Sequence, residues 1–240
     1  MKSVIGTKVG MTQVFATDGR KIPVTVVYVE PNNVLAVKTI EKDGYNAVQV
    51  GYETVEKNKL NKPKLGQFKN AKSDPKRYIK ELRDVTGLSV GDLIKCNAFE
   101  IGEIVDVQGI TKGHGFTGSI KRHNFKIGPM GHGAGYPHRY TGSIAAGRGG
   151  SQAQRVLKNT KMPGHYGHEL VTIKNLQIVN VIEEENLILI KGAIPGPKNS
   201  IIKIKTSTHR PNEKEAIEIV NYKKAPVSQE AVSESNESAE

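Results

Sequence analysis

The feature that most constrains this chain is a window of 62 residues, 107–168, that contains no aspartate or glutamate. Asp106 and Glu169 bound the window, and its nine lysines and arginines give it a formal charge of +9, against +11 for the whole chain. It also holds 14 of the 25 glycines and six of the seven histidines. Large aliphatic residues are few, so the segment cannot bury enough apolar surface to form a core of its own.

A structureless segment of this length inside a compact domain is either functional or disordered. Glycines, spaced cations and aromatic residues favour an extended arm that becomes ordered on a polyanion. Arginine binds phosphate bidentately, imidazoles donate hydrogen bonds to phosphates and 2′-hydroxyls, and aromatic rings stack on unpaired bases, so we expect a folded RNA rather than a membrane. The predicted RNA-binding residues are Lys112, His114, Lys121, Arg122, His123, Lys126, His132, His138, Arg139, Arg148, Arg155, Lys158, Lys161 and His165.

Several classes of protein are excluded by composition. No apolar run approaches the roughly 18 residues of a membrane-spanning helix, and the first residues lack the apolar stretch of a signal peptide. Cys96 is the single cysteine, which excludes an intramolecular disulfide and a thiolate metal cage. We expect a cytoplasmic protein with no cofactor, no small-molecule substrate and no homo-oligomer.

Three sequence features suggest other functions, but each lacks residues that the function would require. Residues 113–118 match G-x-G-x-x-G, yet no carboxylate follows before Glu169 to bind a ribose. The histidines of the window have no acid or cysteine beside them to complete a metal site. The window also offers no carboxylate to act as a base or to orient a histidine, and Cys96 lies in an apolar segment predicted to be a core strand, so we expect no enzyme.

Strand patterns occur on both sides of the window. The first residues, 1–15, are strand-like, and β-branched or alternating runs predict further strands at residues 23–29, 34–39, 45–52, 93–96, 103–107, 170–173, 176–182, 187–191 and 201–204. Residues 53–72 are rich in lysine and asparagine and are interpreted as a loop. Residues 73–87 are predicted to be a helix, because Ser73 and Asp74 can cap it and Tyr78, Ile79 and Leu82 share a face. Its cations form either a solvated face or a direct RNA contact.

These patterns predict a mainly β fold with a small β-barrel and a long extended loop. The first part of the barrel is expected in residues 1–106, the basic glycine-rich arm in 107–168, and the remaining strands in 169–208. Residues 209–240 carry four cations and seven acids, and their serine- and glutamate-rich end predicts a disordered acidic tail.

Several motifs in collinear order resemble one known family. Residues 99–118 read FEIGEIVDVQGITKGHGFTG, residues 128–133 GPMGHG, and residues 161–167 KMPGHYG. Residues 5–15 (IGTKVGMTQVF) and 189–196 (LIKGAIPG) fit the same pattern. The chain resembles the family of large-subunit ribosomal protein L three, in its bacterial form, over about residues 1–206.

The resemblance implies a translation-protein-type β-barrel with a small α+β insertion at about residues 45–95. It also implies direct binding to large-subunit rRNA, contacts with neighbouring ribosomal proteins, a role in early subunit assembly and no catalytic activity. The extended loop would approach the peptidyl transferase centre with its tip, formed here by Arg148, Gly149, Gly150, Ser151 and Gln152. The alternative is a free RNA-binding regulator or RNA chaperone that exchanges among RNAs.

Two features depart from the family pattern. The loop tip, residues 142–156, is about three residues longer and lacks the usual Thr-Pro-Gly. The position of the glutamine that some bacterial members methylate falls here on Ser151, so we do not carry that modification over. The acidic tail after Ser207 extends beyond the usual end of the family, and we interpret it as a solvated extension.

Overall fold

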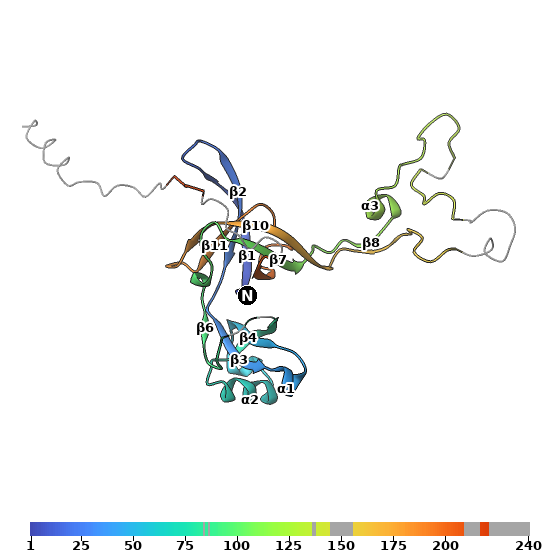
Figure 1. Ribbon diagram of the computed structural model, residues 1–240. Coiled ribbons are helices and arrows are strands. Elements are labelled where there is room, and N and C mark those ends of the chain that lie inside the picture. Colours follow the sequence, from blue (N-terminus) through green and yellow to red (C-terminus); the bar gives the residue numbers. More distant parts are fainter. Residues whose placement is uncertain (84, 86, 136–137, 145–155, 209–216, 221–240) are drawn as a thin grey trace, which may run out of the picture.

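A computed structural model describes residues 1–83, 85, 87–135, 138–144, 156–208 and 217–220. Within these residues, six antiparallel strands close a barrel in the order β1, β12, β7, β10, β11, β2 (Figure 1). The strands are β1 (Ser3–Phe15), β2 (Lys21–Tyr28), β7 (Ile104–Ile110), β10 (Leu170–Ile182), β11 (Leu187–Lys191) and β12 (Ile201–Thr206). The prediction of a mainly β fold, with barrel strands from both sides of the arm, is confirmed.

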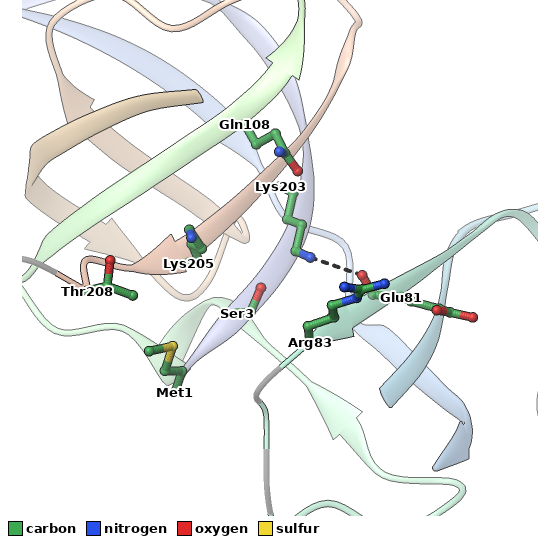
Figure 2. Close-up of a pocket in the computed structure, with 8 residues that line it drawn as sticks. All are labelled: Met1, Ser3, Glu81, Arg83, Gln108, Lys203, Lys205 and Thr208. Atoms are coloured by element: carbon green, nitrogen blue, oxygen red, sulfur yellow. Dashed lines mark hydrogen bonds between the residues drawn. The ribbon is translucent and has the colours of Figure 1, made fainter. Parts of the chain in front are cut away.

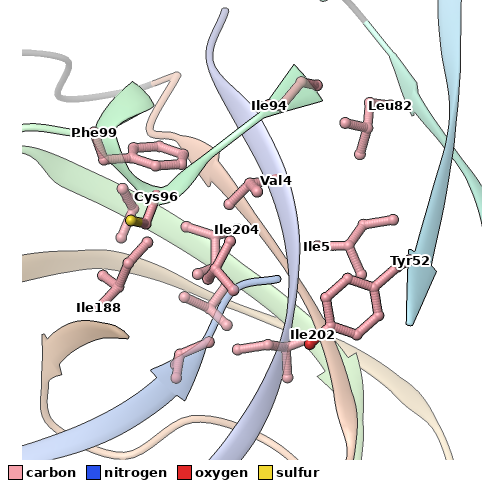
Figure 3. Close-up of a cluster of buried hydrophobic side chains, with 14 of the residues drawn as sticks. Val4, Ile5, Tyr52, Leu82, Ile94, Cys96, Phe99, Ile188, Ile202 and Ile204 are labelled. Atoms are coloured by element: carbon pink, nitrogen blue, oxygen red, sulfur yellow. The ribbon is translucent and has the colours of Figure 1, made fainter. Parts of the chain in front are cut away.

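Alternation along the strands builds the barrel interior. Val105 and Val107 on β7, and Ile202 and Ile204 on β12, lie two residues apart and are all buried. Because successive side chains of a strand point to opposite faces, this spacing turns both pairs into the barrel. Figure 3 shows Ile202 and Ile204 among the side chains of this core.

A smaller antiparallel sheet with the order β5, β4, β3, β6 packs against the barrel. Its elements, in chain order, are β3 (Asn32–Lys38), α1 (Ile40–Asp43), β4 (Ala47–Thr54), the 3-10 turn η1 (Lys57–Lys59), α2 (Lys62–Asn70), β5 (Lys76–Arg83) and β6 (Leu93–Ile94), followed by the 3-10 turn η2 (Cys96–Ala98). This unit therefore starts at β3, before the position of about 45 that the resemblance implied.

The barrel and the smaller sheet share one core. Tyr52 and Leu82 from the sheet are buried in the same cluster as Ile5 and Ile202 from the barrel (Figure 3). The Tyr52 hydroxyl donates to the carbonyl oxygen of Tyr28, 3.1 Å away, and burial raises the pKa of Tyr52 to about 12. Burial of apolar surface between the two sheets therefore holds them as one packed unit.

The prediction of a helix over residues 73–87 is wrong, because this segment contains β5. Strand β5 pairs with β4 from Lys76 opposite Thr54 to Arg83 opposite Ala47. Leu82 faces the shared core, whereas Ile79, an odd number of residues away, packs on the opposite face against Phe68 and its neighbours. A helix would place Ile79 and Leu82 on one face. A strand places them on opposite faces, where both side chains can be buried, and this burial outweighs the helical pattern.

The interpretation of residues 53–72 as a loop is also wrong, because α2 lies there. Pro63 sits in its first turn, and Phe68 is its buried residue. Phe68 packs with Leu35 and Ala71 on the face of the smaller sheet that points away from the barrel. Packing of this buried aromatic side chain stabilises a helix whose other residues are mostly polar.

The two strands predicted at residues 170–173 and 176–182 form a single strand, β10. Its pairing with β7 shifts register between Ile173 and Leu176. Asn175 lies at this irregularity with φ of +60°, and its N–H donates to Asp106 Oδ1 at 3.0 Å. Asp106 is buried and thus anchors the bulge from the neighbouring strand.

Four residues of the acidic tail, 217–220, are described and lie against the barrel. Ile219 bridges Ala16, and the Val220 N–H donates to the Phe15 carbonyl oxygen at 3.0 Å. Ile217 and Ile219 pack against a second apolar cluster that includes Ile22 and Val24. Ile217, Ile219 and Val220 are therefore partly buried, against the expectation of a solvated tail, whereas Glu218 is exposed.

We expect a chain truncated after Thr208 to lose about 1–3 kcal/mol of unfolding free energy, because Ile217 and Ile219 would no longer cover the second cluster. For a chain of this size that lowers Tm by roughly 2–10 °C in a thermal melt. Truncation after Val220 is the control, since it keeps these contacts and should melt like the full chain. Equal melting temperatures for both truncations would contradict the assignment.

Candidate nucleic-acid interface

The arm leaves the barrel as a continuation of two barrel strands. Strands β7 and β10 pair as far as Ile110 opposite Leu170, and beyond them the Thr111 N–H donates to the Glu169 carbonyl oxygen at 2.9 Å. The short strands β8 (Gly115–Thr117) and β9 (Gly164–Tyr166) then pair in turn. Figure 1 shows this two-stranded ribbon projecting away from the barrel. The basic window therefore begins with a defined structure.

Ring stacking and a close backbone approach fix the base of this ribbon. The His114 N–H donates to the Tyr166 carbonyl oxygen at 2.9 Å, and the two rings stack with centroids 5.0 Å apart. At Gly167 φ is +76°, and a β-carbon there would collide with the Lys112 carbonyl oxygen. Only glycine fits this position without strain, because both the dihedral angle and the space exclude a side chain.

A buried lysine supports the barrel beside the arm base. Lys8 Nζ donates to the carbonyl oxygens of Ile194 at 2.8 Å and Gly196 at 2.9 Å, which fixes the turn between β11 and β12. Burial, together with the charge of Lys112, lowers the pKa of Lys8. The two carbonyl acceptors satisfy the buried ammonium group, so this cation is used inside the scaffold.

Beyond the ribbon, three of the predicted RNA-binding residues hold the arm together. Arg122 and His123 lie on α3 (Ser119–His123), and both reach the Met162 carbonyl oxygen on the returning strand, at 2.9 and 3.2 Å. His138 Nδ1 lies 2.8 Å from the Pro129 carbonyl oxygen. Arg122 and His123 connect segments about 40 residues apart, whereas His138 closes a loop of nine residues, and their spacing did not predict these contacts.

The other described candidate residues present their side chains to solvent. They are Lys112, His114, Lys121, Lys126, His132, Arg139, Lys158, Lys161 and His165. The ion pairs that join two described residues lie between residues 2 and 103, and none of these pairs involves the arm. The predicted residues Arg148 and Arg155, and the loop tip 148–152, lie outside the described residues.

Apolar side chains on the arm are exposed as well. Phe116 is 79% exposed, Met130 72% and Tyr140 53%. Exposure of these apolar side chains to water does not stabilise the fold. An unpaired base can stack on flat or flexible apolar groups that lie between cations. The arm thus combines charge for phosphates with surfaces for bases.

The described residues bear on two other kinds of feature, a metal site and a membrane-spanning helix. They contain no group of three or more histidine, cysteine or acidic residues placed to hold a metal ion. None of their helices has the length and apolarity that crossing a bilayer requires. Cys96 is buried, as predicted, although it lies in η2 and not in a strand, and burial raises the pKa of its thiol.

Some cations near the arm base were missed by the sequence reasoning. Lys203 and Lys205 alternate with the buried Ile202 and Ile204 on β12, so they point out of the barrel. The same alternation, applied to charged residues, could have identified this outward face. No short motif signals it.

Barrel, smaller sheet and projecting ribbon define a class of protein: a packed β scaffold that carries an extended cationic arm. A family model described as Ribosomal protein L3 matches residues 92–186, which include the arm. The chain is 66% identical over 222 residues to the large ribosomal subunit protein uL3 of Ureaplasma urealyticum, covering 92% of this chain and 95% of that one. The uL3 protein of Mycoplasmoides gallisepticum is 57% identical over 226 residues, covering 94% and 96%. The chain therefore belongs to the ribosomal protein L3 family.

Replacing Gly167 by alanine should open the base of the ribbon. The added β-carbon meets the Lys112 carbonyl oxygen and the left-handed φ disfavours alanine, at a cost of about 1–3 kcal/mol. Hydrogen exchange at the His114 amide should then speed up by roughly ten- to a hundredfold. Gly118→Ala is the matched control, because nothing lies within 4 Å of its β-carbon position. Unchanged exchange at His114 in Gly167→Ala would show that the close approach does not constrain the ribbon.

Proposed function

We propose that this chain is a structural component of the large ribosomal subunit that binds large-subunit rRNA directly through its arm. The observation that carries the proposal is the described part of the arm, whose exposed cations have no ion-pair partner among the described residues. Exposed, unpaired cations that follow one another along an extended backbone can each contact a phosphate where the arm passes between segments of a folded RNA. The names of the similar proteins, large ribosomal subunit protein uL3, support the same assignment.

The arm's construction supports a threading role in the assembled particle. Its base continues the paired barrel strands β7 and β10, and farther out Arg122 of α3 donates to the Met162 carbonyl oxygen across the arm. An RNA that folds around such an arm is stabilised by it, so the protein acts early in assembly of the subunit in the cytoplasm. The loop tip, residues 148–152, lies outside the described residues, and we propose that it approaches the peptidyl transferase centre.

The role is structural and not catalytic. The arm offers no carboxylate that could act as a base, and Cys96 is buried in the core. Neighbouring large-subunit proteins are its protein partners, and the barrel and smaller sheet supply the surface that contacts them.

A variant with a shortened arm tests this function in cells. Thr117 pairs with Gly164, so replacing residues 118–163 by Asn-Gly closes the ribbon with a two-residue hairpin turn. We expect the full chain to remain in large subunits washed with high salt, and the shortened chain to be absent from them. Both should melt cooperatively, because the barrel and its core are unchanged.

If the full chain washed off the subunit, a free RNA-binding regulator or chaperone would replace the structural role. A shortened chain that stays bound after the same wash would show that the arm is not needed for stable binding to the subunit. Loss of cooperative melting on shortening would show that the arm belongs to the core.

Binding to an isolated large-subunit rRNA transcript should weaken steeply with salt. If roughly six to nine arm cations contact phosphates, log Kobs falls against log salt with a slope of about −4 to −8. The measurement is filter binding of the full chain over a salt series. A flat response would contradict an electrostatic interface, and the shortened variant should show a smaller slope.

A further inference from the structure

Strand β1 has one edge that the barrel covers only in part. Its first half pairs with β12 as far as Thr7, and Figure 2 shows Ser3 of β1 beside Lys205 of β12. Its second half pairs with β2 on the other edge, as far as Phe15. Between residues 9 and 14, no strand of the described chain pairs with the edge that β12 leaves. We call this stretch, residues 9–14, the open edge of β1.

The last described segment of the chain lies against the end of the open edge. The Thr17 N–H donates to the Glu218 carbonyl oxygen at 3.1 Å, and the Val220 N–H donates to the Phe15 carbonyl oxygen at 3.0 Å. In an antiparallel pair, backbone groups two residues apart point to the same side of a strand. The N–H and C=O groups of Gln13 therefore point to the side on which the C-terminal segment already pairs.

Pairing on the other side of β1 shows that these groups are not used there. Pro23 stands opposite Gln13 on β2 and has no N–H to donate. The Pro23 carbonyl oxygen accepts from the Gly192 N–H at 2.9 Å, and Gly192 follows β11 on the far side of β2. The open edge also carries an apolar side chain, Met11, which is 52% exposed. An exposed strand with unused backbone groups is a site where a further strand can add.

The contact at Ala16 fixes the register in which the C-terminal segment would continue. Ala16 lies opposite Ile219 in an antiparallel bridge. Each further residue of the segment therefore comes opposite the residue one position earlier on β1. In this register Tyr222 comes opposite Gln13, and residues 221–225 come opposite residues 10–14.

The residues that follow Val220 suit such a strand. Ile219 packs against the second apolar cluster, so the register turns Val220 and Tyr222 to the opposite face. There Tyr222 is a diagonal neighbour of Met11, a cross-strand arrangement that stabilises sheets. Pro226 has no N–H and cannot continue the pairing, so its position in the sequence limits the added strand to residue 225.

We propose that the open edge of β1 is the docking site of the chain's own C-terminal segment, with residues 221–225 as an added antiparallel strand. The described chain favours this occupant over a second copy, because pairing has already begun at Phe15. Twenty residues follow Val220, and five are enough to cover the edge. Attachment to the same chain also keeps the segment at high local concentration. A covered edge cannot pair with another copy, so the added strand protects the protein against edge-to-edge association.

Cysteine pairs test the register in the full chain. Thr12→Cys with Lys223→Cys places two side chains opposite each other, at a Cα separation of about 4.5 Å that a disulfide can bridge. Thr12→Cys with Lys224→Cys removes the same charge and is the matched control, because a shift of one residue turns the second side chain to the other face. Cys96 is buried and does not compete.

We expect the first cysteine pair to oxidise about tenfold faster than the control pair in a glutathione redox buffer, because only its side chains are held together. The measurement is the disulfide-linked fraction against time, by mass spectrometry of peptides. Equal rates for the two pairs would overturn the proposal.

Hydrogen exchange gives a second test that does not depend on cysteines. Tyr222→Pro removes the N–H that would donate to Gln13, so the Gln13 amide should exchange about fivefold faster or more. Ser228→Pro, beyond Pro226, is the matched control and should leave that rate unchanged. Both positions lie outside the described scaffold. Exchange at Gln13 that is equal in both variants would contradict an added strand.

Thermal melting is a poor readout for this pairing. The entropy lost on ordering five residues offsets most of the gain from hydrogen bonds on an exposed edge, so the melting temperature changes little. Exchange at single amides reports the pairing directly.

A mixture of two single variants tests for the competing occupant. Chains with Thr12→Cys alone are mixed with chains that carry Lys223→Cys alone, under the same redox buffer. We expect few disulfide-linked dimers, because each open edge is covered by its own segment. Dimers that form as fast as the bond within the double variant would identify a second copy as the occupant and overturn the proposal.

Discussion

The antiparallel pairing of β7 with β10 is the constraint on which the rest of the structure depends. It places the start and the end of the basic window opposite each other, at Ile110 and Leu170. Closing a long loop costs little more than closing a shorter one, about 0.6 kcal/mol for each doubling of length. Because the barrel already brings the ends together, the arm can be long and poor in core residues without weakening the fold. The barrel hydrogen bonds that close the arm also point it away from the scaffold.

The stability of the scaffold comes from a core that two sheets share. Ile5 and Ile202 of the barrel are buried together with Tyr52 and Leu82 of the smaller sheet. Each sheet alone would expose this apolar face, so neither is expected to be stable without the other. The hollow between β5 and β12 is therefore bounded by two elements of one packed unit.

β-Branched and alternating runs in the sequence were enough to predict the barrel strands, although β7 is buried on both faces from Ile104 to Val107. These patterns failed at β5, which is also covered on both faces. In β5, Leu82 faces the shared core and Ile79 faces α2, and the same spacing is also consistent with one helix face. The error at α2 has a related cause, since Phe68 packs against Leu35 of β3 and Ile79 of β5, and only the folded sheet brings these residues together. Local patterns could not decide between these arrangements without the tertiary contacts.

Composition identified the arm, but it could not separate cations that face solvent from cations that hold the protein together. Arg122 and His123 meet the Met162 carbonyl oxygen across a gap of about 40 residues in sequence. No spacing rule relates residues so far apart. The loop-tip residues and Arg148 lie outside the described residues, so their assignment stays a prediction.

Acids are distributed unevenly between the scaffold and the arm. Acids of the scaffold are matched to its own cations: Glu30 lies 2.8 Å from the buried Lys76, and Glu53 lies 2.9 Å from Arg77. The arm has no acid at all, so its cations have no carboxylate of their own segment to pair with, and like charges along it repel one another. Packing of the scaffold can therefore proceed with its charges balanced, whereas the positive charge of the arm stays uncompensated within its own segment.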